Sequence, residues 1–461
     1  MARKASDNPW MAEELDGGDE DAIDRAYLGV REAISRELHE KQLGLVSAAD
    51  TIIIGLPVPA LALRYLLGSS VLPLGRIIQI TGEEGSCKTS LMVEMMRWHM
   101  VYGGGAAYIE NEGKDPDELR RAILCWNEHW IRRCDVANTF SLQEWMAALT
   151  VILEKLRAHQ SNPDGPGRVY PYMVGIDSLM STAPDEELAK TFDDGYASRG
   201  YGIGANLITR YMRTMPAQLR DYPFTIVGTN HLKPSVDFMG RPSAQSPGGK
   251  SVKFHETYEI EMHRAYQPDI DLLDYGGIKL KLVCKKSSVS PSRRHIFAEL
   301  LWWNEQFGGR SRQQIAWDWD TASIETLLGF SQAKGKKTLG DAVMDICDIT
   351  IADKTRRTAW SRALGIPQSD PQYFRVLGAE LEKRLDILAG LYHVLGIIER
   401  PVFMPGVDFL AQKDAALAAA RAAEPGNLYD VSRAMPVFDD GVIGPPAAEL
   451  QPSAPETTDD G

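Results

Sequence analysis

A lysine and two hydroxyl residues follow a glycine-bearing loop in the segment RIIQITGEEGSCKTSLMVEMM. Residues 76–80 form an apolar run typical of a strand, and a helical pattern begins near Lys88. At such a junction the backbone N–H groups of residues 85–89 point at phosphate groups, helped by the amino end of the helix. Lys88 would reach the β- and γ-phosphates, and the Thr89 hydroxyl would ligate Mg²⁺. We therefore predict a P-loop for ATP and Mg²⁺, with these nucleotide contacts: Gly82, Glu83, Glu84, Gly85, Ser86, Cys87, Lys88, Thr89 and Ser90.

Cys87 departs from the P-loop pattern G-x-x-x-x-G-K-[ST], which has glycine at this position. The Cβ of a cysteine crowds the backbone beside the phosphates. Because the thiol would lie at a helix amino end next to Lys88, we expect its pKa to be lowered and the thiol to react readily. A chance loop before a helix is the alternative interpretation.

Carboxylates end two later apolar runs. In YMVGIDSLMS the run ends at Asp177, where the carboxyl end of a parallel strand can place a carboxylate on Mg²⁺ or its water, the Walker B arrangement. Thr89 and Asp177 are thus the predicted metal ligands. In AAYIENEG the run ends at Glu110, Asn111 and Glu112, where a carboxylate can polarise the water that attacks a γ-phosphate. A solvated acidic turn is the alternative for this second segment.

Polar residues also end the apolar run of FTIVGTNHLKP. Thr229, Asn230 and His231 would lie beside the γ-phosphate and sense its presence, although a lone histidine is more often structural.

The Gly-, Pro- and Ser-rich stretch KPSVDFMGRPSAQSPGGKSVKF follows. A loop of this length is uncommon inside a compact domain. Its predicted contacts with a nucleic-acid backbone are Lys233, Arg241, Gly248, Gly249 and Lys250.

These residues need a scaffold that brings strand ends together. Over residues 46–332, the runs RIIQIT, AAYIEN, YMVGID and FTIVGTN alternate with helical patterns at 90–102, 115–131, 142–159 and 204–220. That alternation predicts an α/β fold with a mostly parallel central sheet covered by helices. IKLKLVCKK and RRHIFAELLWW predict further strands, antiparallel to their neighbours.

The rest of the chain divides by composition. We expect a disordered acidic start at 1–20 and an amphipathic helix at 21–45, which either mediates oligomerisation or packs on its own core. A linker at 331–338 leads to a small helical C-terminal domain at 339–435. The acidic, Pro-rich tail at 436–461 has too few apolar residues to fold.

The bulk composition excludes some classes of protein. Hydrophobic residues make up 44% and charged residues 25%, as in soluble globular proteins. No run reaches the roughly 20 apolar residues of a membrane span, and the acidic start does not resemble a secretory signal. Five cysteines without CxxC spacing predict neither disulfides nor zinc, which fits a cytoplasmic protein of bacteria or of phage-infected cells. The net charge of −13 argues against a passive nucleic-acid coat, but basic loops can still bind phosphates.

Taken in order, these segments resemble the RecA-type recombinase family, particularly its divergent, phage-like branch, over about residues 46–310. The resemblance implies that Glu112 is the catalytic base, acting with Lys88, and that Asp115 contacts the nucleotide. It implies a γ-phosphate sensor at His231, where bacterial members carry Gln. The resemblance further implies DNA contacts at Arg199, which lies in a first DNA-binding loop near 194–204, and at Arg213. It implies subunit contacts at Lys253 and Phe254. It also implies that Lys285 and Lys286 contact the ATP of a neighbouring subunit.

The resemblance also implies a mechanism. Subunits would assemble head to tail around ATP and Mg²⁺, as a helical filament or alternatively as rings. A DNA-dependent ATPase of this kind would bind single-stranded DNA and pair it with homologous duplex DNA. Its other expected partners are single-strand-binding or mediator proteins, and no membrane is expected to take part. Two alternatives stay open. One is a hexameric replicative helicase. The other is a recombination mediator or regulator that binds nucleotide without hydrolysing it. The cysteine at position 87, where the P-loop pattern has glycine, is the reason for this alternative.

Overall fold

The computed structural model describes residues 52–113, 117–159, 169–188, 203–236, 242–245, 249–265, 275–307, 310–319, 324, 327–328, 356–370 and 373–422. The predicted acidic start at 1–20, helix at 21–45 and tail at 436–461 lie outside these ranges. The chain divides into two units, Met1–Ile52 and Ile53–Gly461, and every element below belongs to the second. No helix in the described part is both long and apolar enough to cross a membrane.

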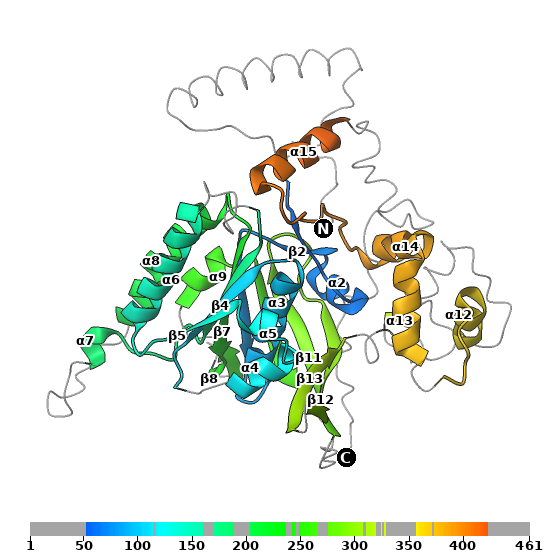
Figure 1. The fold of residues 1–461 in the computed structure, drawn as a ribbon, viewed down its shortest axis with the longest axis horizontal. Helices are drawn as coiled ribbons and strands as arrows, with labels where there is room; N and C mark the ends of the chain where they lie inside the picture. The colour runs from blue at the N-terminus through cyan, green and yellow to red at the C-terminus, as the bar shows by residue number, and fades with distance from the viewer. Residues whose placement is uncertain are drawn as a thin grey trace, which may run out of the picture. The chain divides into compact units, whose positions relative to one another are not determined.

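A nine-stranded sheet forms the centre of the described core (Figure 1). Its strands, in order across the sheet, are β13 (Arg310–Asp318), β12 (His295–Phe307), β11 (Tyr275–Ser287), β10 (Tyr258–Arg264), β3 (Arg76–Gly82), β7 (Phe224–His231), β6 (Tyr172–Asp177), β4 (Gly105–Glu110) and β5 (Cys134–Asn138). Neighbouring strands run parallel from β10 to β5 and antiparallel from β10 to β13. The predicted α/β fold with a mostly parallel sheet is confirmed.

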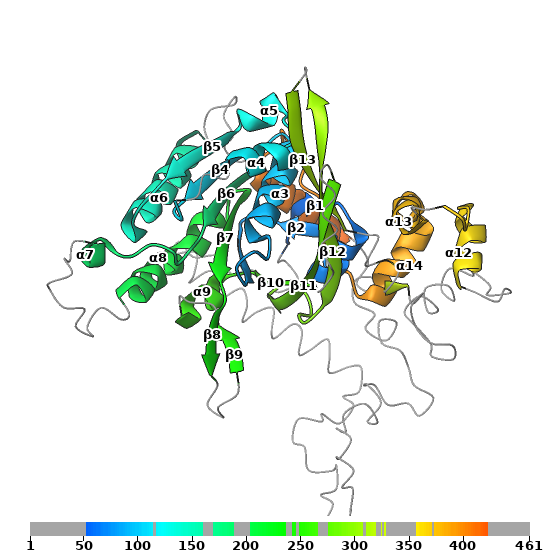
Figure 2. The ribbon, with the colours of Figure 1, turned by 90° about the horizontal axis from the view of Figure 1, so that it is seen from below.

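Helices cover both faces of the sheet (Figure 2). Two separate clusters of buried side chains lie between helices and strands. One joins α3 (Lys88–Val101) and α4 (Asp117–Ile123) to the sheet, and the other joins α6 (Leu142–Ala158) and α8 (Ile203–Leu219) to the opposite face. Because both faces are covered, the central strands β3 and β6 are buried almost throughout rather than at alternate residues.

Helix α6 shows how local sequence sets these layers. The Ser141 side chain caps the helix by accepting a hydrogen bond from the backbone N–H of Glu144. One stripe of the helix is apolar at intervals of three or four residues, which places it against the sheet. That stripe consists of Leu142, Trp145, Met146, Leu149, Leu153 and Leu156, all of them buried.

The helical pattern at 115–131 was expected to form one helix, and in the described part this is wrong. Helix α4 ends at Ile123, and a separate short helix, α5 (Glu128–Ile131), follows. Between them Cys125 and Trp126 have positive φ angles of 53° and 52°, which break the helix. The Trp126 indole N–H donates a 2.8 Å hydrogen bond to the backbone oxygen of Gln313 on β13, so a contact with the sheet edge accompanies the break.

Smaller elements surround the core. They are β1 (Gly55–Pro57), α2 (Leu61–Leu67), β2 (Val71–Pro73), α7 (Asp185–Leu188), β8 (Lys233–Val236), β9 (Pro242–Gln245), α9 (Gly249–His255), α12 (Arg356–Leu364), α13 (Tyr373–Lys383), α14 (Leu385–Leu395) and α15 (Phe409–Ala422). Strands β8 and β9 pair as an antiparallel hairpin within the loop expected to contact DNA.

The described part of the predicted C-terminal domain is helical, from α12 to α15. It contacts the core beside α2. There the Arg64 guanidinium donates a 2.9 Å hydrogen bond to the Tyr392 hydroxyl and forms a 3.2 Å ion pair with Glu382. The limits of this domain stay a prediction.

Candidate functional site

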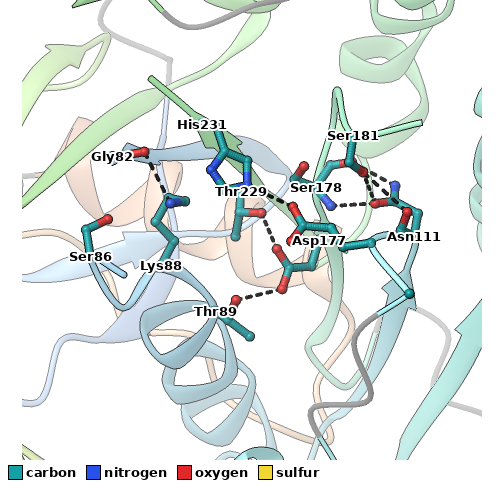
Figure 3. A network of polar contacts seen from close by, with 12 residues as sticks. Gly82, Ser86, Lys88, Thr89, Asn111, Asp177, Ser178, Ser181, Thr229 and His231 are labelled. Carbon is teal, nitrogen blue, oxygen red and sulfur yellow. Dashed lines mark hydrogen bonds and ion pairs between the residues drawn. The ribbon is translucent and has the colours of Figure 1, made fainter. Parts of the chain in front are cut away.

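Four parallel strands end at one edge of the sheet, and each ends in residues singled out from the sequence. In the strand register Gly82 of β3 lies opposite His231 of β7, and Glu110 of β4 lies opposite Asp177 of β6. The carboxyl ends of parallel strands share an edge. Figure 3 shows the resulting network of polar side chains between α3 and these strand ends.

The loop from Gly82 to Thr89, here called the P-loop, connects β3 to α3. Lys88 is buried, with 7% of its surface exposed. Its ammonium donates hydrogen bonds to the backbone oxygens of Gly82 at 3.2 Å and Glu83 at 2.7 Å (Figure 3). The Ser86 hydroxyl donates a 2.8 Å bond to the same Glu83 oxygen. The lysine charge is thus held inside the loop, at the amino end of a helix, which is the arrangement that binds phosphate.

Cys87 has a left-handed backbone conformation, with φ 62° and ψ 30°. This conformation explains why the P-loop pattern has glycine here, because a residue with a Cβ adopts it only at a cost of about 1–2 kcal/mol. The chain keeps the glycine-type backbone with a cysteine in it. The expectation of a lowered thiol pKa is wrong. Burial raises the pKa of Cys87 to about 11, although the nearby charges of Arg264 and Lys88 act in the opposite direction.

Asp177 accepts hydrogen bonds from hydroxyl groups on both of its oxygens. Oδ2 accepts from Thr89 at 2.7 Å and from Tyr108 at 2.7 Å, and Oδ1 accepts from Thr229 at 2.5 Å. Asp177 is 7% exposed. Such charge-assisted bonds hold a buried carboxylate in one orientation. Asp177 and Thr89, predicted separately as metal ligands, are therefore in direct contact.

Glu112 and His231 also come together. The Glu112 Oε1 atom lies 3.0 Å from His231 Nε2, and the two side chains are 10% and 35% exposed. Glu110 contacts backbone groups of its own turn instead. Its carboxylate accepts from the backbone N–H groups of Glu112 at 2.9 Å and Gly113 at 3.2 Å, which holds the turn after β4. Of the two glutamates, Glu112 is the one whose side chain contacts a residue at another strand end, His231 of β7.

Asn111 links the turn after β4 to the segment after β6 (Figure 3). Its amide nitrogen donates a 2.7 Å bond to the Ser178 backbone oxygen, and its Oδ1 accepts from the Ser178 N–H at 2.6 Å and from the Ser181 hydroxyl at 2.5 Å. The sequence pattern did not single out Asn111 or Tyr108 as site residues. Asn111 directly follows the end of β4 beside residues that were singled out, which is the signal that could have found it. Tyr108 lies inside the apolar run of β4 and gives no such signal.

Comparison with known proteins places this site in a family. No protein-family model matches the chain. Protein RecA of Acholeplasma laidlawii is 24% identical over 274 residues, covering 57% of this chain and 75% of that protein. Protein RecA of Bacillus subtilis is 25% identical over 270 residues, covering 57% and 71%. Protein RecA of Treponema denticola is 24% identical over 261 residues, covering 56% and 58%.

The chain is a divergent relative of these RecA proteins over more than half of its length. The resemblance drawn from the motifs is confirmed at this level, and the phage-like branch stays a prediction. The roles given to individual residues of this RecA-type chain stay predictions too.

The lysines expected to reach a neighbour's ATP lie apart from the chain's own P-loop. Lys286 of β11 pairs with Glu259 of β10, which pairs with Gln79, well before the end of β3 at Gly82. Lys285 forms a 2.9 Å ion pair with Glu261. The Lys286 ammonium donates to the backbone oxygens of Glu256, at 2.8 Å, and of Lys253. Contacts of these lysines with a neighbouring subunit's ATP stay a prediction.

The predicted DNA and subunit contacts are described only in part. Asp115, Arg199, Arg241 and Gly248 lie outside the described residues. Lys233 begins β8, and Gly249 and Lys250 begin α9. Arg213 is exposed on α8, Lys253 is exposed on α9, and Phe254 beside it is 75% exposed.

Arg264 is a further site residue that the sequence pattern did not single out. It ends β10 beside the P-loop, and its Nη1 atom lies 3.9 Å from the point where a Cβ on Gly85 would stand. Its charge acts to lower the pKa of Cys87, against the larger effect of burial. The P-loop therefore has a cation on its exposed side as well as the buried Lys88.

The donor set fits a magnesium–nucleotide complex. A hydroxyl oxygen from Thr89 and a carboxylate oxygen from Asp177 are hard ligands 2.7 Å apart. Mg²⁺ in nucleotide sites takes few protein ligands and completes its shell with phosphate oxygens and water. The two protein ligands predicted from the sequence are therefore of the right chemical type for Mg²⁺, and their role as ligands stays a prediction.

Proposed function

We propose that this RecA-type chain is an ATP-dependent DNA recombinase, which forms filaments on single-stranded DNA and pairs it with homologous duplex DNA in recombination and repair. The observation that supports the proposal best is the meeting of Lys88, the Thr89–Asp177 pair and the Glu112–His231 pair at one sheet edge. The family relationship supports the nucleic-acid part.

The proposed binding step starts from the P-loop. Backbone N–H groups and the Lys88 ammonium take the phosphates, and the ammonium exchanges the carbonyl oxygens of Gly82 and Glu83 for phosphate oxygens. Thr89 and Asp177 would hold Mg²⁺, which when bound supplies charge stabilisation to the phosphates. The Lys88 ammonium comes from the first turn of α3, and the two carbonyl oxygens that it leaves belong to the start of the P-loop.

The proposed hydrolytic step uses Glu112. Its carboxylate accepts a proton from water as the water oxygen bonds to the γ-phosphorus and the bond to the bridging oxygen breaks, leaving ADP and phosphate. His231 lies 3.0 Å from Glu112 and can exchange that contact for one with the γ-phosphate. Nucleotide state would thereby change the turn after β4 and the segment after β7. The latter leads directly into the β8–β9 hairpin.

The test is ATP hydrolysis by the full chain with and without single-stranded DNA, with Lys88→Ala as the control. We expect DNA to stimulate hydrolysis and the substitution to abolish it. Electron microscopy with a non-hydrolysable ATP analogue should then show filaments on the DNA. Closed hexamers with unwinding activity would instead favour a replicative helicase.

A second candidate is a recombination mediator or regulator that binds nucleotide without turning it over. The observation that favours it is the left-handed backbone of Cys87, a strained P-loop position without its usual glycine. DNA binding that depends on ATP, in the absence of any hydrolysis, would favour this candidate over the recombinase.

A further inference from the structure

Asp177 is held from both neighbouring strands. Strand β6 lies between β7 and β4 in the sheet. Thr229 on β7 donates a 2.5 Å hydrogen bond to Oδ1, and Tyr108 on β4 donates a 2.7 Å bond to Oδ2. The aspartate therefore receives one buried hydroxyl on each oxygen, because Tyr108 is 1% exposed and Thr229 is fully buried.

The strand register explains how the tyrosine reaches the aspartate. Tyr108 lies opposite Gly175, and the next residues along β4 and β6 bring Glu110 opposite Asp177. Residues two apart on a strand share a face, so the Tyr108 ring and the Asp177 carboxylate lie on the same side of the sheet. Gly175 between them carries no Cβ, and one built there would lie 2.3 Å from Met96 of α3.

The third hydroxyl on Asp177 differs from these two. Thr89 belongs to the first turn of α3 and is partly exposed. If the chain binds nucleotide as proposed above, a lone pair of the Thr89 oxygen would go to the metal, so this hydroxyl would be shared between the metal and Asp177. Tyr108 and Thr229 are buried in the sheet and have no predicted role at the metal. Among the described residues, they therefore hold the carboxylate whether or not the metal is bound.

We propose that Tyr108 and Thr229 are positioning residues that clamp Asp177 and so set the Mg²⁺ affinity of the nucleotide site. This inference rests on the proposed function. A carboxylate that loses a donor in a buried setting is less well oriented, and this weakens its bond to a cation. The clamp acts through Asp177 and touches neither substrate nor metal.

Burial alone would give Tyr108 a purely structural role, so the test needs a matched control. Tyr258 serves, because it is also fully buried in the sheet and its hydroxyl donates a 3.1 Å bond to the Leu67 backbone oxygen, away from Asp177. Tyr258→Phe removes the same atom as Tyr108→Phe. Thr229→Val removes the other hydroxyl of the clamp with little change in shape, and Thr229→Ser retains a donor.

The experiment titrates Mg²⁺ into each full-length variant with a fluorescent ADP analogue and measures the Mg²⁺ concentration at half-maximal binding. We expect Tyr108→Phe and Thr229→Val each to raise it about tenfold, the usual size of one lost bond to a charged group. Tyr258→Phe and Thr229→Ser should leave it near the wild-type value. Melting temperatures identify any variant that is simply unfolded. If one clamp variant is unfolded, the Mg²⁺ dependence of the variant at the other clamp residue tests the proposal.

The outcomes separate the two proposals. If the wild type binds ADP with Mg²⁺ but Tyr108→Phe and Thr229→Val bind it at the wild-type Mg²⁺ concentration, the clamp is wrong and the proposed function stands. If the Tyr258→Phe control shifts as far as Tyr108→Phe, the effect is structural and the clamp is again wrong. If the wild type binds no magnesium–nucleotide, both proposals are overturned.

Discussion

The Thr89 hydroxyl donates a 2.7 Å hydrogen bond to Oδ2 of Asp177 and so joins the start of α3 to the end of β6. Both residues were predicted metal ligands, and this contact gives the simplest test of that role. Thr89→Val keeps the shape and removes the ligand oxygen. We expect nucleotide binding to require at least about tenfold more Mg²⁺. Thr89→Ser should behave as wild type in the same titration. Equal Mg²⁺ dependence of the Val and Ser variants would remove Thr89 from the metal site.

The left-handed backbone of Cys87 predicts a difference between glycine and alanine at this position. Both substitutions remove the thiol, but only glycine adopts φ 62° without steric cost. We expect Cys87→Gly to be more stable than Cys87→Ala by about 1 kcal/mol in the free energy of unfolding. Urea denaturation of the two variants measures the difference. Equal stabilities would mean that residue 87 does not hold this conformation in solution.

The raised thiol pKa of Cys87 predicts slow alkylation at neutral pH. Burial holds the pKa near 11, so the reactive thiolate is scarce until the pH approaches that value. Iodoacetamide labelling of Cys87, followed by mass spectrometry at a series of pH values, should show a rate that keeps rising toward about pH 11. A rate that levels off near neutral pH would show instead a thiol activated by the helix end and Lys88.

Glu256 predicts a pH dependence of stability. It is 1% exposed, and within the described residues its carboxylate oxygens accept no hydrogen bond. Burial raises its pKa to about 8 from an ordinary value of 4.5. The charge of Glu259 adds to this, and Lys286 and Lys253 oppose it. The folded state therefore binds a proton that the unfolded chain releases, so stability falls as the pH rises from about 4.5 to about 8.

Glu256→Gln is the variant that checks this dependence. The amide cannot ionise, so the variant should gain on the order of 5 kcal/mol over wild type above about pH 8 and little near pH 5. Urea unfolding at several pH values gives the comparison. A gain of equal size at every pH would point to packing rather than ionisation.

The proposed role of Lys285 predicts that a substitution there affects ATP hydrolysis without affecting nucleotide binding. It lies apart from the chain's own P-loop and pairs with Glu261 at 2.9 Å. If it serves a neighbouring subunit, Lys285→Ala should leave nucleotide affinity of the dilute protein unchanged and lower DNA-stimulated hydrolysis by at least about tenfold. Equal losses in binding and hydrolysis would place Lys285 in its own subunit's site.

Much of this site could be predicted because its residues follow apolar runs in a fixed order. The spacing of Lys88, Thr89 and Asp177 on strand ends of a parallel sheet was enough to expect them together, and Thr89 and Asp177 are in contact. Tyr108 could not be found in this way. It lies inside an apolar run, where a tyrosine is expected for packing, and only the pairing of β4 with β6 brings its hydroxyl to Asp177.

Other features depended on tertiary contacts that local patterns do not contain. The break between α4 and α5 accompanies a contact of Trp126 with β13, nearly two hundred positions away in the chain. Strand β5 was not predicted, because its sequence CDVAN is short and mostly exposed. The thiol pKa of Cys87 was mispredicted because its burial outweighs the neighbouring positive charges, and burial cannot be read from a motif.

The place of β7 between β3 and β6 has a consequence for the growing polypeptide. Strand β7 comes last of the three in the chain but lies in the middle of them in the sheet. Two strand spacings, about 10 Å, separate β3 from β6, and β7 fills that interval. During translation the P-loop and Asp177 are therefore synthesised well before they can be held together. A ribosome-bound chain that has not yet exposed Phe224–His231 should be unable to retain nucleotide.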